Sequence, residues 1–451
     1  MCRDNAWDMT ADPPPTPTAF ARAKEIAAEE NSHSGEPVSQ ETTHRRETSR
    51  RPPLAASGSR VSLQRSRGYT FDVLRTNDEL RSIEHEWLEL FERSLTRNPF
   101  SHPAWVTAWL QHFVPDERGR LVVVARSAGE VVGVAPFHSR PYRLGPVKAR
   151  CLQLAGGSPT ADDPLTEMSE ILVARDGWRA TVRAIVGNLI GEHADGYDWI
   201  GLTMPPDQGW FDDEWVPEDW QRGGAFTLHK GIRPFVVLPL PASWEELSLK
   251  RNVKEAIRRS KNRLAALEGD SQIVFVEGGA VADAAAQVQT LHRMRAEMTG
   301  HLPHDDYFEN DAFAAFARDA CAGLAATGHA AVALSLLDSQ PIAGRVVLHA
   351  HGSAFLSYSG TDPAHWELGA ATGLIEASIR AAIARRDDSL NFSGNPDPAK
   401  LRWSERLEFH NEFIVVAPSR RARAALSLFW QARARRSLAG RRQTLWRRNG
   451  Y

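Results

Sequence analysis

Apolar positions divide the middle of the chain into two series of predicted elements. The first series begins with a strand at Tyr69 and continues with helical spacing of apolar residues over 78–94 and 102–113. Two β-rich runs then flank Ala128-Gly129-Glu130, which predicts a hairpin because small residues permit a tight turn. The series ends with strands near 149–154 and 170–173, a helix over 178–192 and a strand over 197–205.

The second series repeats this order after a basic helix that is expected over 243–267. Segments 122–137 and 332–347 each contain a strand, a turn and a second strand entered through Gly or Ala. In both halves a later helix leads into a further strand, with the second of these helices expected over 370–386. The pattern favours an internal duplication and an α/β (α+β) fold. A chance similarity between two hairpins is the alternative.

The two ends of the chain differ from this folded region in composition. Residues 1–67 contain Pro13 to Pro15, scattered Ser and Thr, and few large apolar residues. Such a segment cannot bury enough surface to offset its chain entropy, so we expect a disordered tail. The sequence thus predicts four segments: a tail over 1–67, folded halves over 68–240 and 241–418, and a basic C-terminal helix over 419–451.

Composition and charge narrow the class of protein. With 451 residues, 42% hydrophobic and 24% charged, the chain is typical of a soluble globular protein of two to three domains. The net charge of -2 includes an acid-free stretch from Arg420 to Arg448, so the remainder is acidic and a general nucleic-acid-binding role is not expected. Three cysteines without metal-ligand spacing, no apolar signal segment and no long apolar run favour a cytoplasmic protein without a bound metal.

One loop has the composition of a phosphate-binding site. Gly369, Ala370, Ala371, Thr372 and Gly373 lie between a predicted strand and a predicted helix, without any bulky side chain. Backbone NH groups at such a helix start can approach a pyrophosphate and add the positive end of the helix dipole. The alternative is that the small residues only permit close packing.

Several short motifs follow one another in a fixed order over roughly 69–416. They are the run Asn98 to Trp105 followed by Trp109, Gly133 to Phe137, the basic helix from Arg251, Leu291-His292, Pro341-Ile342-Ala343, Tyr358-Ser359-Gly360, Phe392-Ser393-Gly394, Lys400 and Trp403. In their order and spacing they resemble the CelD-type acetyltransferases of the GNAT superfamily, which are related to FemAB-type transferases built as two GNAT-like halves. No single motif decides this resemblance.

This resemblance implies tandem GNAT-like domains, each a mixed, mostly antiparallel sheet flanked by helices. It also implies acetyl-CoA or another acyl-CoA as co-substrate, bound by the second half, and a small-molecule or saccharide acceptor in the cleft between the halves. The acceptor would contact Trp105, Trp109, Asn391 and Lys400. The family usually has an acidic residue at the position of Asn391, and the loop lacks the Arg or Gln with two glycines of typical GNAT enzymes.

Acyl transfer needs few protein groups beyond precise positioning and a donor for the oxyanion. Tyr358 is a candidate general acid toward the departing thiolate, and Asp362 or Glu367 is a candidate proton acceptor. Lys400 could neutralise a phosphate or carboxylate, with a solvated loop lysine as the alternative. Asp162 and Asp163, among Pro and Gly, are expected to form a turn and not a metal site.

Two other functions stay open at this stage. One is a FemAB-like enzyme that takes an aminoacyl group from charged tRNA, and the other is a degenerate GNAT pair that serves as a scaffold at a membrane-bound polysaccharide machine. The acyltransferase that the resemblance implies would itself act in polysaccharide or cell-envelope biosynthesis. The basic C-terminal segment combines arginines with Leu, Phe and Trp. It is expected either to lie on the anionic inner face of the membrane or to pack as an ordinary helix.

Overall fold

The computed structural model describes residues 63–66, 68–94, 96–144, 147–156, 163–190, 196–204, 222, 224–299 and 304–431. Most of the tail expected over 1–67, and residues 432–451 of the basic segment, lie outside the described residues. Strand β1 (Leu63–Ser66) is described, and it pairs with the strand that begins at Tyr69. These four residues therefore belong to the sheet and not to the expected tail, because their backbone groups are used in strand pairing.

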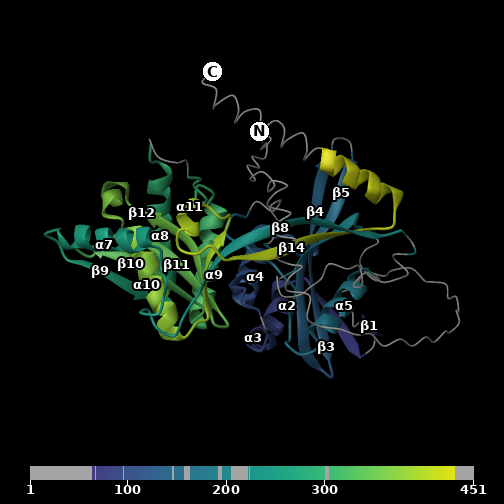
Figure 1. Cartoon of the computed structure of the whole chain (residues 1–451). Helices are drawn as coiled ribbons and strands as arrows, with labels where there is room; N and C mark the ends of the chain where they lie inside the picture. Colours follow the sequence, from purple (N-terminus) through teal and green to yellow (C-terminus); the bar gives the residue numbers. More distant parts are fainter. Residues whose placement is uncertain are drawn as a thin grey trace, which may run out of the picture. The chain divides into compact units, whose positions relative to one another are not determined.

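The first half has its helices before and after a run of antiparallel strands (Figure 1). Thr76 and Glu79 form a capping box that starts its first helix. The elements are β2 (Tyr69–Leu74), α2 (Asn77–Ser82), α3 (Glu84–Glu92), η1 (Pro99–Ser101), α4 (Pro103–Phe113), η2 (Glu117–Gly119), β3 (Arg120–Ser127), β4 (Glu130–Leu144), β5 (Val147–Leu154), β6 (Leu172–Val173), α5 (Trp178–Asn188) and β7 (Trp199–Met204).

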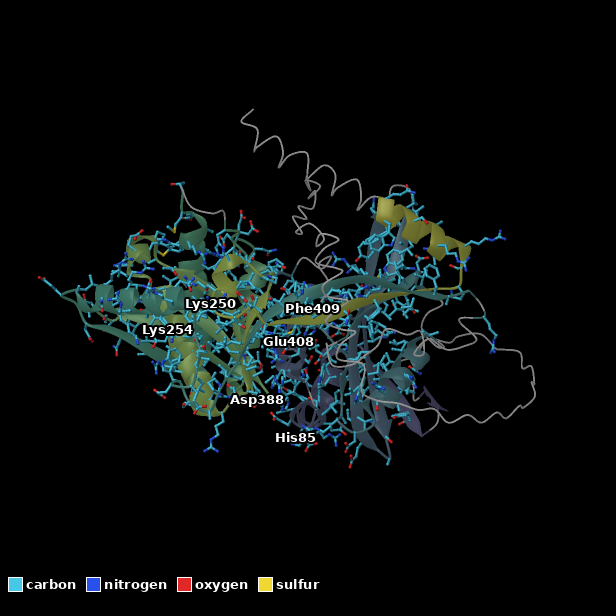
Figure 2. The ribbon with its side chains drawn as sticks, in the orientation of Figure 1. His85, Lys250, Lys254, Asp388, Glu408 and Phe409 are labelled. Carbon is cyan, nitrogen blue, oxygen red and sulfur yellow. The ribbon has the colours of Figure 1, made fainter. Side chains whose placement is uncertain are left out.

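The second half repeats this order after helix α7 (Arg251–Ala265). This helix begins later than expected, after Lys250, which Figure 2 labels together with Lys254. The remaining elements are β9 (Ser271–Val276), η7 (Gly278–Ala280), α8 (Val281–Ala296), α9 (Asp311–Ala326), β10 (Ala330–Leu337), β11 (Gln340–Ala350), β12 (Ser353–Thr361), η8 (Pro363–Leu368), α10 (Ala370–Arg385), β13 (Ser389–Gly394) and α11 (Pro398–Leu401).

Two long strands that the hydrophobic pattern did not predict join the halves. They are β8 (Phe226–Pro239) and β14 (Leu407–Val416). Phe409, which Figure 2 labels, lies on β14 and is partly exposed. All described strands form one 14-stranded sheet in the order β1-β2-β3-β4-β5-β7-β14-β8-β13-β12-β11-β10-β9, with β6 beside β4. The pairing is antiparallel except for β5 with β7 and β12 with β13. The expected mixed, mostly antiparallel sheet with flanking helices is therefore confirmed.

The two hairpins of the sequence repeat have the same geometry. In β3–β4 the register passes from Ala125↔Gly133 to Arg126↔Val131, and in β10–β11 it passes from Ser335↔Ala343 to Leu336↔Pro341. Each second strand thus carries one extra residue at the same place. Both turns also place their two central residues at positive φ, namely Ala128 and Gly129 in one and Asp338 and Ser339 in the other. This agreement supports the internal duplication.

The core is shared between the halves on one face of the sheet. There, residues of α3, α4, α8 and α9 form a single apolar cluster, and the rings of Trp105 and Phe316 lie 5.1 Å apart. On the other face, α5 covers the first half, while α7 and α10 cover the second. The second half thus holds β12 and β13 between two helical layers.

The described part of the basic C-terminal segment is helical over 420–431. Ala422, Ala425 and Leu426 are buried, and Arg421 donates to the backbone oxygen of Lys148 over 2.9 Å. These residues follow the packing alternative, whereas the proposed membrane contact depends mainly on residues outside the described range. Among the described residues, no helix combines the length and apolar character needed to cross a membrane.

Candidate functional site

Strands β12 and β13 separate after three residue pairs. They run parallel at Ser353↔Ser389, Ala354↔Leu390 and Phe355↔Asn391. Beyond these pairs, β12 continues beside β11 as far as residue 361, and β13 continues beside β8 as far as residue 394. We call residues 356–361 and 392–394 the strand divergence. In the first half, β5 ends one residue after its last pair with β7, so this feature is specific to the second half.

An irregularity in β12 occurs at the strand divergence. Arg345 of β11 pairs with Ser359 and Val347 pairs with Leu356, so Ser357 and Tyr358 together oppose one residue of β11. Such a bulge interrupts the ladder and redirects backbone groups. It therefore gives β12 the means to present a backbone NH toward the space between the strands.

The Arg345 side chain spans this bulge. It donates to the backbone oxygen of Ser357 over 3.2 Å and to Ser359 Oγ over 3.1 Å. Burial lowers the pKa of the guanidinium to about 10, and its buried Nε has no partner among the described residues. Arg345 thus fixes the bulge.

The predicted phosphate-binding loop forms the start of α10. Gly369 has φ +70°, which glycine adopts readily, and its oxygen accepts bonds from Ser260 Oγ and the Thr372 NH, both over 2.9 Å. The NH groups of Ala370 and Ala371 have no acceptor among the described residues. Gly373 faces Ile273 and Ser260 instead, so its role is packing. Gly373 therefore serves helix packing, whereas Ala370 and Ala371 offer backbone NH groups without an acceptor among the described residues.

Two further arginines lie near this helix start. Arg402 is 3.4 Å from Thr372 Oγ1, and its Nε is buried without a partner. The Arg295 guanidinium lies 5.5 Å from the centre of the Trp366 ring and forms no ion pair with any described residue. Burial lowers the pKa of both groups. An anionic ligand at the start of α10 would meet both cations.

Asn391 and Lys400 lie together on the β13 side of the strand divergence. Asn391 Oδ1 accepts from the Ser393 NH over 2.8 Å, and Lys400 Nζ donates to Ser393 Oγ over 2.8 Å and to the Gly394 oxygen. Burial lowers the pKa of Lys400, and Glu167 opposes this effect. The Lys400 side chain is therefore fixed by two hydrogen bonds, unlike the solvated loop lysine that was the alternative.

Sequence reasoning missed Glu167, which belongs to the first half. Its carboxylate accepts from the NH of Gly394, a residue 227 positions further along the chain. Burial raises the pKa of this carboxyl, while Lys400, the Gly394 NH, Arg233 and Ser393 lower it. Only tertiary structure brings Glu167 to β13, and no spacing in the sequence could have indicated it.

The three expected acid–base residues do not come together. Tyr358 is buried in the shared core, with its hydroxyl 3.8 Å from Cys321 Sγ and its ring packed on Phe308. Asp362 caps η8 by accepting from the Ala364 NH, and Glu367 is exposed. The Tyr358 hydroxyl thus faces the core, whereas the proton-acceptor roles expected of Asp362, which also pairs with His365 over 2.8 Å, and of Glu367 stay predictions.

We expect Tyr358→Phe to keep acyl-transfer turnover within about threefold. Burial raises the pKa of Tyr358 well above its usual value, so this hydroxyl is a poor proton donor, and it faces the core. Steady-state kinetics of the variant and the parent protein, at matched pH, provide the measurement. A loss of about 100-fold in turnover with an unchanged melting temperature would restore the general-acid role.

Trp105 and Trp109 also differ from the expectation that they contact the acceptor. Both are buried in the shared core, and their indole NH groups donate to Thr166 Oγ1 over 2.9 Å and to Asp163 Oδ2 over 2.8 Å. Asp163 in turn accepts from the Leu165 NH, as expected for a turn, while Asp162 lies outside the described residues. The two tryptophans thus position the segment that carries Glu167.

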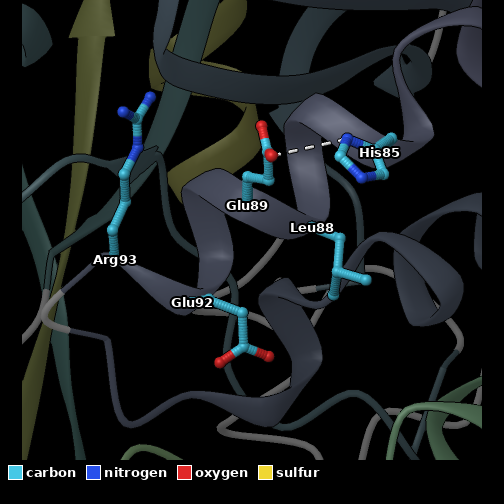
Figure 3. Close-up of a pocket in the computed structure, with 5 residues that line it drawn as sticks. All are labelled: His85, Leu88, Glu89, Glu92 and Arg93. Carbon is cyan, nitrogen blue, oxygen red and sulfur yellow. Dashed lines mark ion pairs between the residues drawn. The ribbon is translucent and has the colours of Figure 1, made fainter.

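Other features of the described residues add no chemistry. A surface hollow of about 490 Å³ is lined by residues on or next to α3, namely His85, Leu88, Glu89, Glu92 and Arg93 (Figure 3). Its one internal ion pair, His85 with Glu89, joins exposed side chains 3.5 Å apart. Within the described ranges, no group of three or more His, Cys, Asp or Glu residues is arranged to hold a metal ion.

Comparison with known proteins finds one family model that matches part of the chain. Residues 251–401 match the model of the acetyltransferase (GNAT) domain, a range that runs from α7 to α11 and includes the strand divergence. A comparison with curated proteins found no match.

Solved structures with a similar fold cover most of the chain. FemX has a TM-score of 0.51 at 12% identity, over 74% of this chain and 96% of FemX. The C-terminal domain (DUF2156) of a putative lysylphosphatidylglycerol synthetase from Agrobacterium fabrum has a TM-score of 0.47 at 11% identity, over 78% and 95% of the two chains. A tandem GNAT protein from the clavulanic acid biosynthesis pathway has a TM-score of 0.36 at 13% identity, over 78% and 99%.

At these identities the likeness to FemX shows the fold alone. The chain contains a GNAT acetyltransferase domain in its second half, which supports the expectation of an acyltransferase.

Proposed function

We propose that the protein transfers an acyl group from an acyl-CoA, with acetyl-CoA the first candidate, at the strand divergence of the second half. The observation that carries this proposal is the separation of β12 from β13 beside a helix start with free donors. Acyl transfer from a thioester needs a slot for the thioester, a donor for the developing oxyanion and a site for the diphosphate. These features lie close together along the chain, between β12 and α11.

The residues present fit such a co-substrate. The NH groups of Ala370 and Ala371 and the positive end of α10 would hold the diphosphate, with Arg402 and Arg295 as nearby cations. Backbone NH groups at the β12 bulge, which Arg345 fixes, would stabilise the oxyanion. Bound acyl-CoA supplies the activated acyl group, and the protein positions it, which contributes ~7 to 11 kcal/mol in favourable cases.

The acceptor is proposed from the CelD resemblance to be a small molecule or saccharide of polysaccharide or cell-envelope biosynthesis. A FemAB-type donor, an aminoacyl-tRNA, is the second candidate, and the fold likeness to FemX favours keeping it in the test. The cations found at the site cluster around the start of α10, which suits a compact diphosphate. Recognition of tRNA would call for a broad basic surface.

Isothermal titration calorimetry on the full chain tests this function. We expect saturable binding of acetyl-CoA and of free CoA, because the diphosphate contacts are common to both. A longer acyl-CoA in the same series then tests the length of acyl group that the slot accepts. Absence of binding to every CoA compound would overturn the proposal. Acyl transfer from aminoacyl-tRNA would then identify the FemAB-type reaction, and its absence would leave the scaffold role.

A further inference from the structure

We propose that Glu167 is a positioning residue through which the first half of the chain sets the orientation and charge of Lys400 in the second-half site. The catalytic part of this inference rests on the proposed acyltransferase function, whereas the effect on Lys400 does not. The first half would thus act on the site directly, through the contact of Glu167 with Gly394 at the end of β13.

Glu167 is held in place from both sides. On the first-half side, neighbouring Thr166 accepts from the Trp105 indole over 2.9 Å. Arg233 of β8 donates to the backbone oxygen of Glu167 over 2.5 Å. On the second-half side, the Glu167 carboxylate accepts from the NH of Gly394. The side chain therefore has little freedom to move away from β13.

The turn that Glu167 contacts has an uncommon backbone. Ser393 has φ +74° and Asn395 has φ +56°, values in the left-handed region that side chains other than glycine seldom adopt. Such a conformation persists only where surrounding contacts enforce it, and it occurs often at functional sites. Three side chains enforce it here: Asn391 and Lys400 bind Ser393, and Glu167 binds Gly394.

Ser393 links the two charged groups. Its hydroxyl accepts from Lys400 Nζ over 2.8 Å, and its side chain helps to lower the pKa of the Glu167 carboxyl. The lysine is therefore oriented by two oxygens of the turn, Ser393 Oγ and the backbone oxygen of Gly394. Because the lysine cannot reach both oxygens unless the turn keeps its shape, a change at Glu167 is expected to change the direction in which Lys400 presents its charge.

Lys400 has charged neighbours from several elements. Glu167 and Asp397 favour its protonated form, while Arg345 of β11 and burial disfavour it. Further titratable groups act on these neighbours: Arg233 of β8 on Glu167, Arg295 of α8 on Arg345, and Glu167 on Tyr307, which precedes α9. Loss of the Glu167 charge removes an attraction, so the pKa of Lys400 falls and the lysine loses its proton at a lower pH.

Competitive labelling with trace acetic anhydride, followed by peptide mass spectrometry across a pH series, measures the titration of Lys400 in the full chain. In Glu167→Gln, which keeps an acceptor for the Gly394 NH, we expect the labelling midpoint of Lys400 to fall by about one pH unit or more. Glu167→Asp keeps the charge and should restore most of the midpoint. Glu86→Gln is the matched control, because Glu86 pairs with Arg126 over 2.6 Å elsewhere in the first half. An unchanged midpoint in folded Glu167→Gln would overturn the proposal.

Kinetics with acetyl-CoA supply the second readout. In Glu167→Gln we expect kcat to fall about tenfold or more, with KM for acetyl-CoA within about threefold, because the diphosphate contacts are unaffected. The alkaline limb of the kcat profile should move to lower pH together with the labelling midpoint. A parallel loss of melting temperature and activity without that pH shift would show a purely structural role. If acetyl-CoA is not a substrate at all, the labelling result still decides the role of Glu167.

Discussion

Replacing Gly360 with alanine is expected to lower the free energy of unfolding by about 3 kcal/mol or more. A Cβ at this position would lie 2.2 Å from the backbone nitrogen of His292 and 2.4 Å from the backbone carbon of Leu291. These are main-chain atoms of α8, so no side-chain rotation can relieve the contact. Relief requires α8 to move away from β12, which opens the core that both halves share.

Thermal and urea unfolding of the full chain measure this effect. Gly231→Ala in β8 is the matched control, because a Cβ at that position meets no atom within 4 Å and its backbone is not left-handed. We expect the control to change the free energy of unfolding by less than about 1 kcal/mol. Equal unfolding curves for the two variants would contradict the close approach of α8 to β12.

This close approach also matters for the site. Because Gly360 lets α8 contact β12, His292 Nδ1 lies 2.9 Å from the backbone oxygen of Ser359, at the bulged end of the strand. The contact fixes the β12 side of the strand divergence independently of Arg345. A stability defect at Gly360 should therefore be accompanied by weaker acyl-CoA binding in whatever fraction remains folded.

The hairpins could be predicted from the sequence because their determinants are local. Continuous apolar runs define β3 and β10, and small or polar residues at 128–129 and 338–339 permit the left-handed turns. The central strands could not be predicted in this way. Strand β8 contains Gly231 and Pro234, shows no alternation of buried and exposed positions, and pairs with β13 and β14, which come more than 140 residues later in the chain. Its pairing depends on the tertiary arrangement.

The same distinction explains the site. The loop at 369–373 was recognisable from small residues between a strand and a helix, and Asn391 and Lys400 lie close to each other in sequence. The face of the sheet on which the Tyr358 side chain lies could not be predicted. In a regular strand, Tyr358 and Phe355 are three residues apart and would lie on opposite faces of the sheet. The β12 bulge puts both side chains in the same core. Arg345 reaches the site through the bulge in the neighbouring strand, and Glu167 reaches it through a contact between segments 227 residues apart.

The variant Ala371→Glu is expected to weaken CoA binding by about 100-fold, or ~2.7 kcal/mol, without loss of stability. Ala371 is the second residue of α10, and its NH is one of the two free donors. A carboxylate there would repel a diphosphate at short range. The same carboxylate suits a helix start, where a negative charge contributes about 0.3–1 kcal/mol to stability. The substitution therefore separates ligand binding from folding.

Position matters for this test, because Gly369→Glu would add a side chain to a left-handed residue with φ +70° and strain the fold. Ala384→Glu is the matched control, since Ala384 is exposed near the other end of α10 and carries the same new charge away from the free donors. Calorimetry with free CoA should give an affinity within about twofold of the parent for Ala384→Glu, and unfolding curves should confirm that both variants are folded. If the two variants bind CoA equally well, the diphosphate does not bind at the start of α10. The NH groups of Ala370 and Ala371 would then be the unpaired donors at the start of an ordinary helix.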